Sequence, residues 1–172
     1  MITGKAFVYG ANIDTDRIYP GRYLDLTDPE QVRQHAMEGV DARFVSEVQP
    51  GDMIVAATNF GCGSSREHAA VALKTLGLGA VLAESFARIF YRNAINLGLP
   101  LLVCPGIAQQ VNRGDVLSVD WTTGKVINQT TGFATAAQPL SPYVLAILEN
   151  GGIKPMIRKQ MQTHSTHAGE KT

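Results

Sequence analysis

Short apolar runs alternate with helix-like stretches through the middle of the chain. The apolar runs at 53–57, 80–83 and 101–103 have the length and composition of buried strands. Between them, 69–76 and 86–97 place apolar side chains at helical spacing on one face. Strands that alternate with helices are typical of parallel pairing with helical crossovers. The pattern therefore predicts an α/β core.

The flanking segments add strands and a closing helix. Residues 5–9 have the pattern of a first strand, and 115–120 and 125–128 flank a turn in the manner of a β-hairpin. Ser141 followed by proline is typical of a helix start, and Gly151 ends the apolar pattern that follows. The expected fold is a mixed central sheet flanked by helices, with a C-terminal hairpin and helix.

The last residues are mostly polar. We expect one domain over 1–153 and a disordered polar tail over 154–172, because such a segment offers little apolar surface to bury. Ser85 is expected to cap the second helix of the core, whose buried face would include Phe86 and Ile89.

Composition narrows the class of function. Fifteen basic and fifteen acidic residues cancel, so the chain lacks the excess positive charge that nucleic acid or an anionic membrane attracts. The apolar segment 97–108 is interrupted by glycine and proline and is too short for a membrane span. Residues 1–9 lack the features of a signal peptide. The two cysteines fit a reducing cytoplasm.

The richest chemistry follows the run at 53–57. Gly61 and Gly63 allow a ligand to approach the backbone closely, and the helix that follows offers unpaired N–H groups to an anion. Ser64 and Ser65 add hydroxyls, and the planar fork of Arg66 matches a carboxylate. This combination suits a small carboxylate-bearing molecule.

Simpler explanations exist for the same residues. Ser64 or Ser65 could be an ordinary helix N-cap, and Asp14 and Asp16 are common turn residues. The spacing fits neither a Walker A loop nor a dinucleotide-binding glycine motif.

Three motifs together carry a resemblance. They are Asn-Ile-Asp-Thr-Asp at 12–16, Gly-Cys-Gly-Ser-Ser-Arg-Glu-His-Ala at 61–69 and Ser-Phe-Ala-Arg-Ile-Phe-Tyr-Arg-Asn at 85–93. In this order they resemble the swivelling β/β/α domain of the aconitase superfamily, in particular the separate small subunits of 3-isopropylmalate dehydratases. The resemblance covers roughly residues 3–153.

The resemblance implies a hydro-lyase that interconverts 2- and 3-isopropylmalate by dehydration and rehydration in leucine biosynthesis, a branched-chain amino-acid pathway. It assigns Ser64 as the base, acting as an alkoxide, with Ser65 assisting by hydrogen bonding. Arg66 would bind a substrate carboxylate, Gly63 would lie against the substrate, and Asp16 would orient Arg66 or the substrate.

The family's Lewis acid is an iron–sulfur cluster held by cysteine thiolates. Cys62 lies within the glycine turn and Cys104 follows an apolar run, and both are interpreted as structural. The resemblance therefore implies that the cluster belongs to a larger partner subunit, in a heterodimer or heterotetramer, and that this chain binds no metal.

Substrate choice is assigned to the loop that contains Leu24, Asp25 and Leu26. In relatives that act on tricarboxylic acids, the resemblance places an arginine in this loop. Here Asp25 would repel a third carboxylate and the two leucines suit an apolar branch, which favours 3-isopropylmalate, although Arg22 is near. The alternatives are a small subunit of homoaconitase or dimethylmalate dehydratase, or a non-catalytic anion-binding module.

Overall fold

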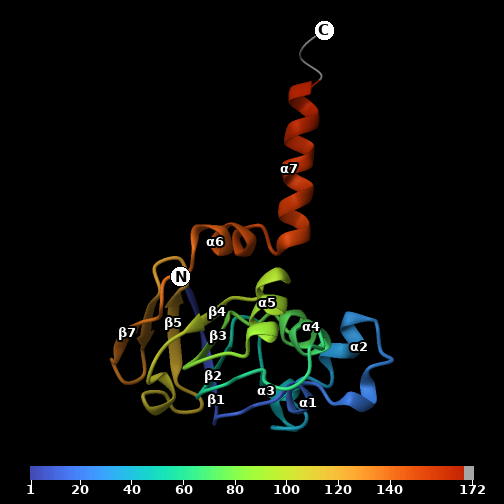
Figure 1. The fold of residues 1–172 in the computed structure, drawn as a ribbon. Coiled ribbons are helices and arrows are strands. Elements are labelled where there is room, and N and C mark those ends of the chain that lie inside the picture. Colours follow the sequence, from blue (N-terminus) through green and yellow to red (C-terminus); the bar gives the residue numbers. More distant parts are fainter. Residues whose placement is uncertain (169–172) are drawn as a thin grey trace.

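A seven-stranded sheet with the order β4-β3-β2-β1-β5-β6-β7 forms the centre of the protein (Figure 1). The computed structural model describes the backbone of residues 1–168 and the side chains of residues 1–162. The strands are β1 (Ile2–Tyr9), β2 (Met53–Ala56), β3 (Ala80–Ala83), β4 (Leu101–Val103), β5 (Val116–Asp120), β6 (Lys125–Asn128) and β7 (Ala134–Ala136).

Strand β1 joins two halves of the sheet. Its residues 6–9 pair in parallel with β2, and its residues 2–5 pair antiparallel with β5. Strands β2, β3 and β4 continue the parallel half, as the alternating pattern predicts. Strands β5 and β6 form the predicted hairpin. The short strand β7, which pairs with β6, was not predicted.

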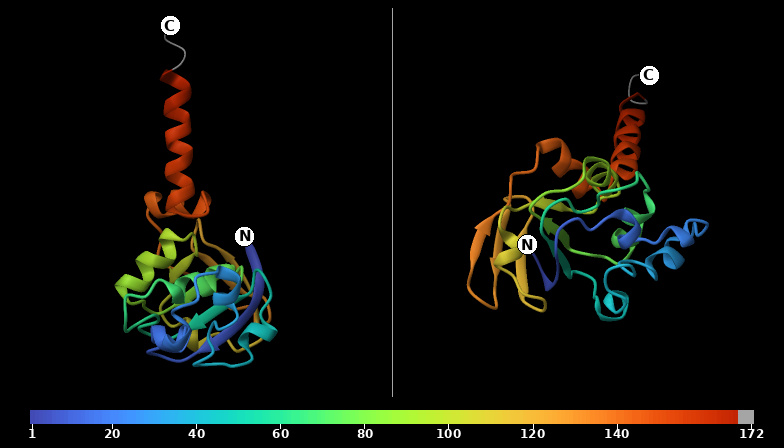
Figure 2. Two further views of the ribbon diagram at one scale, coloured as in Figure 1. Left: turned by 90° about the vertical axis from the view of Figure 1, so that its right-hand side faces the viewer. Right: turned by 60° about the horizontal axis from the view of Figure 1, so that its bottom comes forward.

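Helices cover one face of the parallel half (Figures 1 and 2). The helices of the protein are α1 (Thr15–Ile18), α2 (Pro29–Arg33), α3 (Phe44–Glu47), α4 (His68–Thr75), α5 (Arg88–Asn96), α6 (Pro142–Glu149) and α7 (Ile153–Ala168), with 3₁₀ turns at Gly21–Tyr23 and Ile107–Gln109.

The parallel strands are buried on both faces, which explains their unbroken apolar runs. On the helical face, Ile54 and Val81 belong to the core that α4 and α5 also line. On the other face, Val55 and Leu82 pack with residues of the antiparallel half such as Leu117. The antiparallel half of the sheet, the parallel half and the helices therefore form three layers. This confirms the predicted β/β/α architecture.

The start of α5 differs from the prediction. The helix begins at Arg88 with Ala87 as its N-cap, and Ser85 does not cap it. The hydroxyl of Ser85 instead accepts a hydrogen bond from the Asn59 backbone N–H (2.8 Å). The segment around Ser85 is extended because it pairs with Phe60. Ile89, predicted on the buried face, is 50% exposed.

The end of the chain also differs. Residues expected to form a disordered tail continue as α7, which projects from the body (Figures 1 and 2). Met156 is buried, and its backbone N–H donates to the Gly152 carbonyl (3.2 Å). Lysine, arginine and glutamine in this segment are good helix formers. Residues 169–172 lie outside the described part, and the domain limit at residue 153 stays a prediction.

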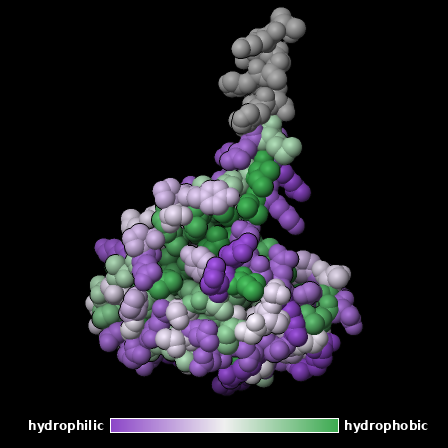
Figure 3. All heavy atoms as spheres, viewed as in Figure 1, coloured by the Kyte–Doolittle hydropathy of each residue, from purple (hydrophilic) through white to green (hydrophobic). Residues whose placement is uncertain are grey.

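Apolar side chains gather where α7 leaves the body beside α6 (Figure 3).

Over the described residues, none of the helices combines the length and the apolar character needed to cross a membrane.

Candidate functional site

Three loops meet at the carboxyl ends of β1, β2 and β3. Because β2 lies between β1 and β3, the glycine-rich loop after β2 lies between the other two. On one side, the Thr15 N–H donates to the Cys62 carbonyl (2.8 Å) and the Gly61 N–H to the Ile13 carbonyl (2.7 Å). On the other side, Phe60 forms a parallel bridge with Phe86. Ligands of α/β sheets bind at this end of the strands.

Gly61 has no room for a side chain. Its φ is +79°, and a Cβ atom there would lie 2.2 Å from the Cγ of Phe90. Phe90 is itself buried and packs edge-on against Phe60, with ring centroids 5.5 Å apart. The glycine therefore lets α5 approach the loop closely.

Replacing Gly61 with alanine is expected to destabilise the fold by about 2–4 kcal/mol, from overpacking against Phe90 and the unfavourable backbone angle. The measurement is the free energy of unfolding in urea. Gly132→Ala is the matched control, because Gly132 has a φ of +80° and a Cβ atom there would have no described heavy atom within 4 Å beyond its chain neighbours. Equal losses in both variants would contradict the packing argument.

Ser64 presents a buried hydroxyl to a cavity. Its Oγ makes no hydrogen bond to the described residues, while its backbone N–H donates to the Thr15 hydroxyl (3.1 Å). The cavity has a volume of about 330 Å³ and is lined by Gly61, Gly63, Ser64, Ala87, Arg88, Ile89 and Arg92. A buried hydroxyl without a partner costs about 1–3 kcal/mol, so it calls for an explanation.

Neither serine of the loop caps a helix. The N-cap of α4 is Glu67, and no side chain accepts a hydrogen bond there. The simpler N-cap explanation for Ser64 and Ser65 is therefore wrong. Ser65 is exposed, and its carbonyl accepts a hydrogen bond from the Asn93 side chain on α5 (3.4 Å).

Arg66 forms an ion pair with Asp16, which lies in the first turn of α1, after β1. The two side chains are 33% and 59% exposed, so solvent screens the pair and it serves orientation more than stability. A Cβ atom at Gly21 would lie 3.0 Å from the Arg66 guanidinium. The predicted contact between Asp16 and Arg66 is therefore formed, at the edge of the loop that begins at Gly21.

The remaining predicted residues lie in this loop. Leu24 and Leu26 are half-buried and pack against the protein's own core, and neither lines the cavity that contains Ser64. Asp25 is exposed. Arg22 forms an ion pair with Glu38 and lies over the ring of Tyr23.

The cysteines do not form a cluster site. Cys62 and Cys104 are both free thiols, and burial raises the pKa of Cys104 to about 11. Iron–sulfur clusters require more thiolate ligands than these two residues supply. Across the part of the chain that the structure describes, no three His, Cys, Asp or Glu side chains gather as a metal site would need.

Sequence reasoning did not find four residues of this site. Thr15 holds the Ser64 backbone and Asn93 holds the Ser65 carbonyl. Arg88 and Arg92 are exposed and line the cavity of Ser64. Their spacing of four along a helix was the available signal, because it places both on one face.

Comparisons with known proteins agree with one another. The aconitase C-terminal domain family matches residues 8–105. The isopropylmalate/citramalate isomerase small subunit of Methanocaldococcus jannaschii is 52% identical over 94% of this chain and 96% of its own length. The 3-isopropylmalate dehydratase small subunit 1 of Methanopyrus kandleri is also 52% identical, over 93% of this chain and 94% of its own.

A solved structure shows the same fold. The crystal structure of 3-isopropylmalate dehydratase from Methanocaldococcus jannaschii superposes with a TM-score of 0.92 at 39% sequence identity. The match covers 96% of this chain and 98% of that one.

Proposed function

The chain belongs to the aconitase C-terminal domain family, among the small subunits of 3-isopropylmalate dehydratases, and we propose that it supplies the proton-abstracting serine of an isopropylmalate-isomerising complex. This membership confirms the resemblance that the three sequence motifs carry. The reaction is the removal and re-addition of water on a hydroxy dicarboxylate in leucine biosynthesis.

One observation carries the proposal. The Oγ of Ser64 is buried, has no hydrogen-bond partner among the described residues, and lines a cavity. Thr15 holds the backbone of Ser64 at the cavity, although nothing in the described part of this chain satisfies the hydroxyl. Such an atom suits a group that meets its partner only when substrate binds.

In this proposal each residue of the chain's own site has a distinct role. Ser64, as an alkoxide, accepts the proton from the carbon next to a carboxylate, and Ser65 assists by hydrogen bonding. Arg66, held by Asp16, binds a substrate carboxylate through its planar fork. Gly63, with a φ of +97°, leaves space for the substrate beside the backbone. Nearby positive charge is required to stabilise an alkoxide.

We assign the step in which the hydroxyl group leaves the substrate to a partner subunit. The described residues of this chain do not fit a metal cluster, and the names of its relatives as small subunits imply a large subunit. We infer that this large subunit carries the iron–sulfur cluster and that the complex is a heterodimer or heterotetramer. The two free thiols favour a reducing, cytoplasmic location.

The substrate proposed is 3-isopropylmalate, because a relative is named for that activity and the exposed Asp25 disfavours a third carboxylate. Leu24 and Leu26 pack against the core, and only the part of each side chain that stays exposed would meet the apolar branch. Citramalate is the second candidate, since a relative 52% identical to this chain is named for both activities. Homoaconitase- and dimethylmalate-type acids complete the panel to be assayed.

The purified chain alone is expected to be colourless, iron-free and inactive. Activity should appear only when it is mixed anaerobically with a large subunit from the same genome, because the two cysteines of the sequence are too few to hold a cluster. Turnover of each acid is followed for the chain alone, for the large subunit alone and for the mixture. Stoichiometric iron in the isolated chain, or turnover by it, would contradict the proposed division of labour.

A further inference from the structure

Two arginines on α5 have no role in the scheme above. Arg88 and Arg92 lie one helical turn apart on one face, and both line the cavity that contains the buried hydroxyl of Ser64. Among the described residues, neither has an acidic side chain within ion-pair distance, whereas Arg22, Arg66 and Arg113 each contact a carboxylate. Their charges are therefore available to a ligand.

The order of the strands places these arginines on the far side of Ser64 from Arg66. Asp16, the partner of Arg66, follows β1, and the segment that begins α5 follows β3. The loop that carries Ser64 follows β2, which lies between those two strands. Positive charge therefore flanks the buried hydroxyl on two sides.

Open space adjoins the same arginines on both sides. They also line a second cavity, of about 370 Å³, whose other walls include Phe86, Tyr91 and Val103. Both side chains are exposed, so their guanidinium groups can turn toward a bound anion without breaking an existing ion pair.

We propose that Arg88 and Arg92 bind one carboxylate of the dicarboxylate substrate while Arg66 binds the other, so that the substrate spans Ser64. The assignment rests on the proposed function and names the residues that make the site selective for two carboxylates. An arginine fork recognises a carboxylate through two parallel hydrogen bonds, and a second arginine adds charge. A monocarboxylate would leave one of the two positive groups without a partner.

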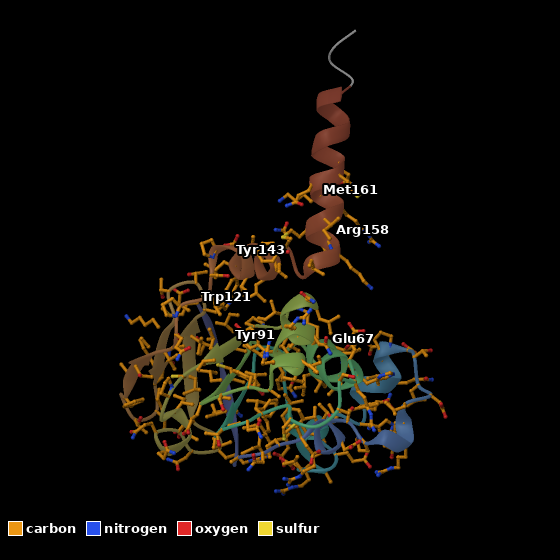
Figure 4. All side chains as sticks on the ribbon, in the orientation of Figure 1. Glu67, Tyr91, Trp121, Tyr143, Arg158 and Met161 are labelled. Carbon is orange, nitrogen blue, oxygen red and sulfur yellow. The ribbon has the colours of Figure 1, made fainter. Side chains whose placement is uncertain are left out.

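The test uses the reconstituted complex at a saturating concentration of the large subunit. Arg88→Gln and Arg92→Gln should each raise KM for 3-isopropylmalate about tenfold or more, with a smaller change in kcat. Arg92→Lys should recover part of the loss, because it keeps the charge without the fork. Arg158→Gln is the control, since Arg158 lies on α7, away from the cavity (Figure 4). Its KM should equal that of the wild type.

Inhibition by substrate analogues identifies the carboxylate that Arg92 binds. Isopropylsuccinate, which lacks the hydroxyl group, should inhibit the wild type better than either of its monomethyl esters does. If Arg92 meets one carboxylate, Arg92→Gln should weaken inhibition by the diacid but not by the ester that lacks that carboxylate. Equal weakening for the diacid and both esters would overturn the assignment.

Two further outcomes separate the possibilities. Variants that need more large subunit for activity, yet keep the wild-type KM once saturated, would place the arginines in the subunit interface and overturn the proposal. A wild-type complex without activity on any of the acids would overturn the proposed function, and this assignment with it. An active wild type with an unchanged KM in both glutamine variants would overturn this assignment alone.

Discussion

Ser64→Ala is expected to lower kcat of the reconstituted complex by about 10²–10⁴-fold, which is the usual loss when a general base is removed. The substitution removes only Oγ, so the hydrogen bond from the residue's backbone N–H to Thr15 is retained. Because the buried Oγ has no partner in the described residues, its loss should not lower the free energy of unfolding and should raise it by up to about 1–3 kcal/mol.

The measurements are kcat in the complex, urea unfolding of the isolated chain, and affinity for the large subunit. Ser65→Ala is the matched control, since Ser65 is exposed and is expected to assist only by hydrogen bonding. Its kcat should fall much less. If Ser64→Ala retained a near-normal rate, the base would have to be Ser65 or a group on the large subunit.

The parallel core could be predicted because burial on both faces leaves a strong mark on the sequence. Strands β2 and β3 each consist of four buried apolar residues, and they are followed by α4 and α5, which line the core. Features that depend on partners distant in sequence could not be predicted. Ser85 resembles an N-cap locally, yet pairing of its segment with Phe60 keeps the backbone extended and moves the helix start to Arg88.

The site divides in the same way. The glycine-rich loop could be located from local residues. Gly61 and Gly63 have positive φ values, which favour glycine, so the sequence itself marks the turn. In the sequence Thr15 is only one member of the Asn-Ile-Asp-Thr-Asp motif at 12–16, and its contact with Ser64 spans 49 positions. A spacing of four is enough to put Arg88 and Arg92 on one face of a helix, but it carries no information about what that face meets.

The second large effect concerns substrate selection by the loop that begins at Gly21. This loop borders the ion pair of Arg66 and Asp16, so its next residues lie near one end of the proposed substrate. Arg22 is held by Glu38 and stacks on Tyr23, which leaves the exposed Asp25 as the charge that an approaching third carboxylate would meet. Like charges repel, and removing a carboxylate from water without a partner costs free energy.

Asp25→Arg is therefore expected to shift the ratio of kcat/KM for a homoaconitate-type tricarboxylate over that for 3-isopropylmalate by about 100-fold or more. The change removes the repulsion and adds a fork that can bind the third carboxylate in two places. The ratio is measured for the wild type and for each variant with the same large subunit. Arg22→Gln is the control and should leave the ratio unchanged, because Arg22 is already paired with Glu38. If the ratio stays constant in Asp25→Arg, the residues that select the substrate belong to the large subunit. If the ratio changes in Arg22→Gln, Arg22 is released from Glu38 when substrate binds.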